Sequence, residues 1–147
     1  MRFINKRGLH NFHITDRLEA GLVLTGSEVK SVRAGRLDLS LSHIKVIQGE
    51  AFLVNANIPR FKQTSDKEYD PFRLRKLLLH RAQIDALIGK ASATGFTLIP
   101  VSIYDKNNRF KVEIGVAKSK KDFDKRKALK EKDQLRRIEQ ELRGEKV

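Results

Sequence analysis

Hydrophobic and polar residues alternate along much of the chain before residue 118, and this period of two predicts short β-strands. The clearest example is the segment 109–117, in which every second residue from Phe110 to Val116 is hydrophobic. Short polar turns separate many of these segments, which favours hairpins and an antiparallel sheet. The predicted extended segments are residues 9–14, 22–33, 44–47, 52–58, 73–79, 96–104 and 109–117.

A clear helical period occurs in one part of this region, where hydrophobic residues three and four positions apart predict a helix before Gly95. These residues are Ile84, Leu87, Ile88 and Ala91. Asp16 followed by Glu19 resembles a helix-capping pair, so one or two helical turns are expected before Gly21. A further helical turn is expected at residues 37–42.

Together these elements predict a mainly β body over residues 1–117. About six short strands joined by short turns, with a few short helices, favour a small closed antiparallel barrel whose ends are plugged by the helices. An oligonucleotide-binding-type barrel is one such solution. Residues 118–147 are predicted to form a separate basic tail.

The sequence is strongly basic, with 31 Lys and Arg against 18 Asp and Glu in 147 residues, a formal net charge of +13. The tail holds 12 basic and 7 acidic residues, which is +5, so +8 remains in the body. Such a charge predicts a polyanionic partner, and we favour nucleic acid over an anionic membrane. The tail has too few hydrophobic residues to fold by itself, so we expect it to be disordered alone and helical when bound.

The absence of cysteine excludes disulfides and thiol catalysis. The N-terminus lacks a hydrophobic signal region, and no apolar run approaches the length of a transmembrane helix. We therefore expect a cytoplasmic protein that does not bind membranes. Neither a phosphate-binding Gly-rich loop nor a His-Glu-x-x-His motif is present, so we expect no metal, no cofactor and no enzymatic activity.

Two other functions are compatible with this composition. A site that cleaves RNA could use His10, His43 or His80, although nothing in their spacing supports it. A constitutive structural protein of the ribosome with an unfolded basic tail would also have this charge.

Basic residues beside hydrophobic ones mark a candidate RNA surface. An exposed leucine in the run 77–79 could pack on an unstacked base, with the preceding cations at the phosphates. Each cation alone is as consistent with a solvated charge as with an RNA contact, but the set together with the net charge favours RNA. The cations of this surface are Lys30, Arg33, Arg73, Arg75, Lys76 and Lys111.

Six short motifs occur in order along residues 5–133. They are Asn5-Lys6-Arg7 followed by His10, Glu19-Ala20-Gly21, Gly26-x-Glu28-Val29-Lys30-Ser31-Val32-Arg33-Ala34-Gly35, Asp70-Pro71-x-Arg73-x-Arg75-Lys76-Leu77-Leu78-Leu79, Lys111-Val112-x-Ile114-Gly115-Val116-Ala117-Lys118 and Asp124-Lys125-Arg126. In this order they closely resemble the family of small protein B (SmpB), the protein partner of transfer-messenger RNA in bacteria.

The resemblance implies an oligonucleotide-binding-type barrel that grips the tRNA-like domain of transfer-messenger RNA as a monomer. The pair would enter the vacant A site of stalled ribosomes, with the tail helical in the empty message channel. Elongation factor Tu would be an indirect partner, through the alanine-charged RNA. Translation would resume on the RNA's own reading frame, and the protein itself would catalyse nothing.

The resemblance also assigns RNA contacts to Glu19, Leu78 and Lys111, which we expect to converge on one outer face of the body. The predicted RNA-binding residues are Asn5, Lys6, Arg7, His10, Glu19, Lys30, Arg33, Arg73, Arg75, Lys76, Leu78 and Lys111. The tail residues expected at the decoding site of the ribosome are Lys118, Lys120, Lys121, Phe123, Asp124, Lys125 and Arg126.

Overall fold

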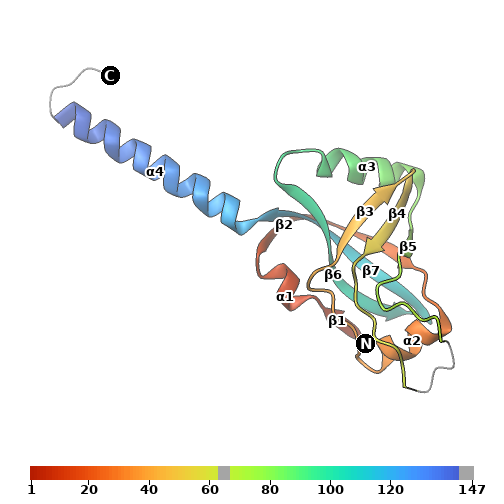
Figure 1. Cartoon of the computed structure of the whole chain (residues 1–147). Coiled ribbons are helices and arrows are strands. Elements are labelled where there is room, and N and C mark those ends of the chain that lie inside the picture. The colour runs from red at the N-terminus through yellow and green to blue at the C-terminus, as the bar shows by residue number, and fades with distance from the viewer. Residues whose placement is uncertain (63–66, 143–147) are drawn as a thin grey trace.

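The computed structural model describes residues 1–62 and 67–142, without the side chains of residues 121–129 and 141. Figure 1 shows a sheet-based body from which the last helix extends. In chain order the elements are β1 (Arg2–Ile4), α1 (Lys6–Leu9), β2 (Phe12–Leu22), α2 (Gly26–Arg33), β3 (His43–Ile47), β4 (Glu50–Val54), β5 (Arg75–Leu78), α3 (Arg81–Ala91), β6 (Phe96–Lys106), β7 (Arg109–Ser119) and α4 (Lys120–Leu142).

The strands form one antiparallel sheet in the order β1-β6-β7-β2-β5-β4-β3. The prediction of a mainly β, antiparallel body is therefore confirmed. Within the described residues no hydrogen-bonded ladder joins β3 to the other end of the sheet, so the predicted closed barrel is not confirmed. The sheet is nevertheless strongly curled, because β3 lies against β6.

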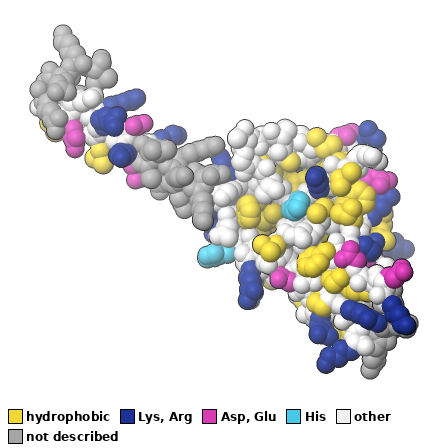
Figure 2. Space-filling model, viewed as in Figure 1, with side chains coloured by type: hydrophobic (Ala, Val, Ile, Leu, Met, Phe, Trp, Pro, Cys, Tyr) yellow, Lys and Arg dark blue, Asp and Glu magenta, His cyan; other side chains and the backbone are white. Residues whose placement is uncertain are grey.

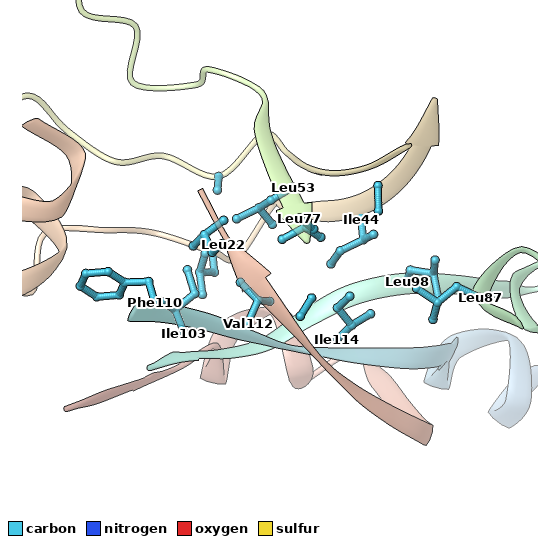
Figure 3. Close-up of a cluster of buried hydrophobic side chains, with 14 of the residues drawn as sticks. Leu22, Ile44, Leu53, Leu77, Leu87, Leu98, Ile103, Phe110, Val112 and Ile114 are labelled. Carbon is cyan, nitrogen blue, oxygen red and sulfur yellow. The ribbon is translucent and has the colours of Figure 1, made fainter. Parts of the chain in front are cut away.

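The curl encloses the hydrophobic core. In Figure 3, Ile44, Leu53 and Leu77 of β3, β4 and β5 lie across from Val112 and Ile114 of β7. All five side chains are buried. Since strand side chains alternate between the two faces, their sequence neighbours on these strands point outward. The polar outer face of the sheet follows from the same pattern that builds the core.

The predicted segments 44–47 and 52–58, and 96–104 and 109–117, form two hairpins, β3–β4 and β6–β7, and each turns through two residues with positive φ. Gln48 and Gly49 have φ of 51° and 77°, and Asn107 and Asn108 have φ of 53° and 61°. Such turns match the right-handed twist of antiparallel strands, and they set the register of the hairpin. The second strand of the first hairpin ends at Val54, earlier than predicted.

The helix predicted before Gly21 is wrong, because β2 runs without interruption through this segment. Its backbone pairs with β7 along nearly its whole length. A β-bulge lies between Ile14 and Asp16, and the Thr15 hydroxyl there donates a hydrogen bond to the Val116 carbonyl oxygen, 3.2 Å away. Pairing with the long strand β7 therefore gives hydrogen-bond partners to backbone N–H and C=O groups that would have lacked them at the ends of a short helix.

The strand predicted over residues 22–33 is also wrong after Leu22, because α2 follows it. Thr25 caps this helix: its side chain accepts a hydrogen bond from the Glu28 N–H, and the Glu28 carboxylate accepts one from the Thr25 N–H. The spacing Thr-x-x-Glu is the sequence signature of this capping box. The signal was therefore present, and the neighbouring hydrophobic residues outweighed it in the prediction.

Two other segments differ from the prediction, and one agrees with it. The start of the predicted strand 9–14 is preceded by α1, and β1 was not predicted. Residues 37–42 form a turn and an isolated bridge, Asp38 to Asn57, rather than a helical turn. The periodic helix before Gly95 is confirmed as α3.

Candidate nucleic-acid interface

A row of paired residues crosses the outer face of the sheet over five strands. It is built by the register of the ladders, which pair Arg2 with Tyr104, Tyr104 with Lys111, Lys111 with Gly21 and Gly21 with Leu78. A neighbouring row pairs Ser102 with Glu113 and Glu113 with Glu19. Residues from distant parts of the sequence therefore share one surface.

This register brings Glu19, Leu78 and Lys111 together around one hollow of about 530 Å³. Gly21 lies between Lys111 and Leu78, and a Cβ atom added to it would lie 3.1 Å from the Leu78 Cβ. The glycine thus leaves room for the leucine side chain, which is 57% exposed although large and apolar. The Glu19 anion can accept from a base amino group, the Leu78 side chain can pack on a base, and the Lys111 cation can bind a phosphate.

The Glu19 carboxylate is surrounded by donors and cations. It accepts a hydrogen bond from the Tyr104 hydroxyl, and the Lys106 Nζ lies 3.8 Å from its Oε1. The Tyr104 hydrogen bond, and then the charges of Lys106, Lys111 and Arg2, lower the pKa of Glu19 against the opposing effect of desolvation. The group is an anion, and so a hydrogen-bond acceptor, at neutral pH.

Two predicted cations, Lys76 and Arg33, lie at the edges of this surface. Lys76 is half exposed on β5 and forms an ion pair of 3.3 Å with Glu50 at the same hollow. Lys30 and Arg33 are exposed on α2. The Arg33 guanidinium lies 6.0 Å from the centre of the Phe110 ring, next to the β7 end of the surface.

Arg75 is not on the surface, which corrects its assignment as an RNA contact. Its side chain is fully buried, and its Nε donates to Glu28 over 2.6 Å. Its other nitrogens donate to the carbonyl oxygens of Ala56 and Pro71. Arg73 is partly exposed but binds the same carboxylate at 2.6 Å. These arginines hold the body together, because a buried charge must be paired and hydrogen-bonded.

The N-terminal basic motif is divided in the same way. Asn5 is buried: its Oδ1 accepts from the Gly8 N–H and caps α1, and its Nδ2 donates to the Pro100 carbonyl oxygen. Its assignment as an RNA contact is therefore corrected to a structural role. Lys6 and Arg7 are exposed and line a second hollow, and His10 is exposed at the end of α1.

The predicted start of the tail at residue 118 falls inside β7, which ends at Ser119 and is followed directly by α4. The Lys120 N–H donates to the Asn11 carbonyl oxygen over 2.9 Å, and Lys118 lies 5.5 Å from the centre of the Phe96 ring. Figure 1 shows α4 extending away from the body. The side chains of the predicted decoding-site residues Lys121, Phe123, Asp124, Lys125 and Arg126 lie outside those that the structure describes.

Charge is distributed widely over the molecule. On the face drawn in Figure 2, hydrophobic side chains gather over the middle of the body, and Lys and Arg lie mostly toward its margins. Among the described residues, no group of three His, Asp or Glu side chains is placed to hold a metal ion. Within the same part of the chain, no helix is long and apolar enough to span a membrane.

The sequence prediction missed three residues of this surface, namely Arg2, Tyr104 and Glu113. Arg2 lies on the unpredicted strand β1. Tyr104 could have been found, because a two-residue turn at Asn107 and Asn108 places it opposite Lys111.

The fold and this surface define a class of protein. It is strongly basic and mainly β, it has a surface that crosses five strands on the outer face of the sheet, and a helix extends from its body. The chain belongs to the SmpB protein family, whose model matches residues 3–144. It is 48% identical over 139 residues to the SsrA-binding protein of Geobacillus thermodenitrificans (strain NG80-2), a match that covers 95% of this chain and 90% of the relative. The SsrA-binding protein of Shouchella clausii (strain KSM-K16) is 45% identical over 139 residues, covering 95% of this chain and 89% of the relative.

A solved structure is also similar. It is described as "tmRNA-SmpB: a journey to the center of the bacterial ribosome", and one of its chains superposes on this one with a TM-score of 0.69 at 39% sequence identity. The match covers 81% of this chain and 84% of the other.

Proposed function

We propose that this protein is an RNA-binding adaptor that binds the tRNA-like domain of transfer-messenger RNA and delivers it to stalled ribosomes for trans-translation. The observation that carries the proposal is the convergence of Glu19, Leu78 and Lys111 around one hollow, in a chain of the SmpB family. Relatives named SsrA-binding proteins and the similar chain in a tmRNA-SmpB structure support the same partners.

In this proposal the body holds the RNA and the tail works in the ribosome. The body, residues 1–117, binds as a monomer through its outer sheet face and serves as an oligonucleotide-binding-type barrel. The basic tail, residues 118–147, orders as a helix in the message channel. Contact with elongation factor Tu is indirect, through the charged RNA, and the site of action is the cytoplasm. No catalytic step is assigned to the protein.

The RNA-binding residues proposed for the body are those that the structure leaves accessible. Lys111 and Lys76 would bind phosphates and Leu78 would pack on a base, with Glu19 accepting from a base amino group. The remaining members of the proposed set are Lys6, Arg7, His10, Lys30, Arg33 and Arg73.

The test is equilibrium binding of the labelled tRNA-like domain by Leu78→Ala. We expect a loss on the order of tenfold or more, because burying a leucine side chain against a base contributes about 1.5–3 kcal/mol. Ile88→Ala is the matched control, since Ile88 is an exposed aliphatic residue on α3 that does not line the hollow. Its affinity should stay at the wild-type value.

An unstructured RNA of equal length distinguishes an adaptor from a general basic protein. Wild-type protein should prefer the tRNA-like domain, and Leu78→Ala should reduce that preference. Equal affinity of the wild-type protein for both RNAs would contradict the proposed function.

A further inference from the structure

Tyr104 holds the Glu19 side chain through a hydrogen bond that spans 85 residues of sequence. The phenol hydroxyl donates to Oε2 of the carboxylate. The other oxygen, Oε1, lies 3.8 Å from the Lys106 Nζ, beyond ordinary hydrogen-bond distance. Glu19 therefore has one oxygen engaged and one able to accept from a further donor.

The Tyr104 ring is itself fixed by contacts from β1. The Arg2 guanidinium lies 4.4 Å from the centre of the ring, in a cation–π arrangement. The same guanidinium lies 3.5 Å from the Glu113 carboxylate and 3.4 Å from the Ser102 hydroxyl oxygen. Strand pairing of Arg2 with Tyr104 keeps these groups in register, so the phenol is held between a cation on its face and the carboxylate at its hydroxyl.

The Tyr104 hydroxyl is a neutral hydrogen-bond donor at neutral pH. Burial, and then the hydrogen bond to Glu19, raise the pKa of Tyr104 to about 12, so its hydroxyl is protonated at neutral pH. A neutral donor orients the carboxylate without cancelling its charge, and the Lys106 ammonium, in a salt bridge of 3.8 Å with Oε1, lies too far from that oxygen to hydrogen-bond to it.

We propose that Tyr104 is a positioning residue for RNA recognition, which fixes the Glu19 carboxylate so that its open oxygen accepts from a base amino group of the bound RNA. This inference depends on the proposed function of the surface. A carboxylate near phosphates is repelled by them, and a freely rotating one would turn away. Ordering it before binding removes that rotational cost from the binding step, which is the general benefit of a preorganised contact.

The first test is the affinity of Tyr104→Phe for the labelled tRNA-like domain. The change removes one oxygen atom and keeps the ring under Arg2. Hydrogen bonds to charged groups lead us to expect an affinity loss of about tenfold. Tyr69→Phe is the matched control, because Tyr69 is the other tyrosine of the chain and its hydroxyl donates to the Ile58 carbonyl oxygen instead. Tyr69→Phe should keep wild-type RNA affinity. Unchanged affinity in Tyr104→Phe would overturn the inference.

A double-mutant cycle separates positioning from a direct contact. If Tyr104 acts through Glu19, the double variant Tyr104→Phe with Glu19→Gln should bind no more weakly than Glu19→Gln alone. Additive losses would mean that Tyr104 contacts RNA itself or supports the fold, and would overturn the inference. Wild-type affinity in Glu19→Gln would instead contradict the role of Glu19 in the proposed function.

A titration of the free protein tests the positioning without RNA. The Glu19 carboxyl carbon, followed by NMR, should show a pKa below the ordinary value in the wild type and a higher pKa in Tyr104→Phe. The charged groups facing this carboxylate are Arg2 on β1, Lys106 on β6 and Lys111 on β7, with Glu113 beside the tyrosine. All of them remain in the variant, so a shift reports on the lost hydroxyl. An unchanged Glu19 pKa would overturn the inference, whatever the RNA-binding experiment showed.

Discussion

The ion pair between Glu28 and Arg75 lies inside the body, where both side chains are at most 1% exposed. The carboxylate also accepts from Arg73 and from the Thr25 N–H. One acidic residue therefore joins the start of α2, strand β5 and the segment leading into it. At the residue scale this is the central polar contact of the body.

The acid response of this pair follows from its surroundings. Burial alone would raise the pKa of Glu28, but hydrogen bonds from Arg73 and Thr25 and the charge of Arg75 outweigh it, and the pKa is lowered. A group with a lowered folded-state pKa stabilises the fold fully above its unfolded pKa. Its contribution is lost as the pH falls from about 4.5 through the lower folded value.

We expect Glu28→Gln to lower the free energy of unfolding by about 3–5 kcal/mol at pH 7, because it leaves Arg75 buried without its counter-charge. Urea denaturation at several pH values measures this. The difference from wild type should shrink as the pH falls below about 4.5, since the unfolded wild-type chain then takes up a proton at Glu28 and the contribution of the pair is progressively lost.

Glu50→Gln is the control for this change. The Glu50–Lys76 pair is half exposed, so its loss should change stability by at most about 1 kcal/mol. Equal effects of the two substitutions would contradict the central role of the buried pair.

At the element scale, β7 lies between two strands, β2 and β6, that each have a β-bulge where they pair with it. The bulge in β2 lies between Ile14 and Asp16, and the bulge in β6 lies between Pro100 and Ser102. Bulges increase local twist, and these two bring side chains of both neighbours onto Gly115. A Cβ atom there would lie 2.8 Å from the Val101 Cγ2 and 3.0 Å from the Ile14 Cδ1.

Gly115→Ala should therefore destabilise the body by about 1–3 kcal/mol through overpacking. The stiff, β-branched Val101 side chain has little freedom to move aside. Chemical denaturation measures the change. Gly89→Ala is the matched control: a Cβ there meets nothing within 4 Å, and Gly89 lies inside α3. It should stabilise by up to about 1 kcal/mol. Stabilisation by both substitutions would show that β7 is not closely packed at Gly115.

At the scale of the whole molecule, the body and α4 differ in what they bury. The body has a continuous hydrophobic core. On α4 the large hydrophobic residues Leu135, Ile138 and Leu142 are exposed by 61%, 52% and 83%. We expect a helix with so little packing to depend on a partner for its order, in line with our proposal that the tail works in the ribosome.

Removal of residues 118–147 should leave most of the affinity for the tRNA-like domain, because the body keeps a charge of +8. Log affinity should still fall with log salt, with a slope of about −0.7 to −0.9 per phosphate contacted. The same truncation should abolish alanine transfer in a reconstituted stalled ribosome supplied with charged transfer-messenger RNA.

Leu135→Pro tests the helix while keeping every charge. It breaks α4 at an exposed position, at a cost of about 3 kcal/mol, and should lose alanine transfer with RNA affinity intact. A truncated protein that no longer binds the RNA would contradict this division between body and tail.

The sequence alone determined the features that depend on near neighbours. Alternation from Phe110 to Val116 predicted β7 and its hairpin, and the apolar period around Ile84 and Leu87 predicted α3. The charge indicated a polyanionic partner, and the ordered motifs identified the family and picked out Glu19, Leu78 and Lys111. The predictions of β7 and α3 succeed because the local hydrophobic pattern fixes which face of an element is buried.

The tertiary structure decided the rest, because it depends on partners far along the chain. Residues 15–20 form a strand because they pair with β7, although their capping residues favour a helix. Arg75 is chemically like the exposed cations around it, and Glu28, 47 residues away, draws it into the interior. Tyr104 reaches Glu19 because strand register places them on one face. A single sequence shows which charged and polar groups need hydrogen-bond or ion-pair partners, and the fold determines which residues those partners are.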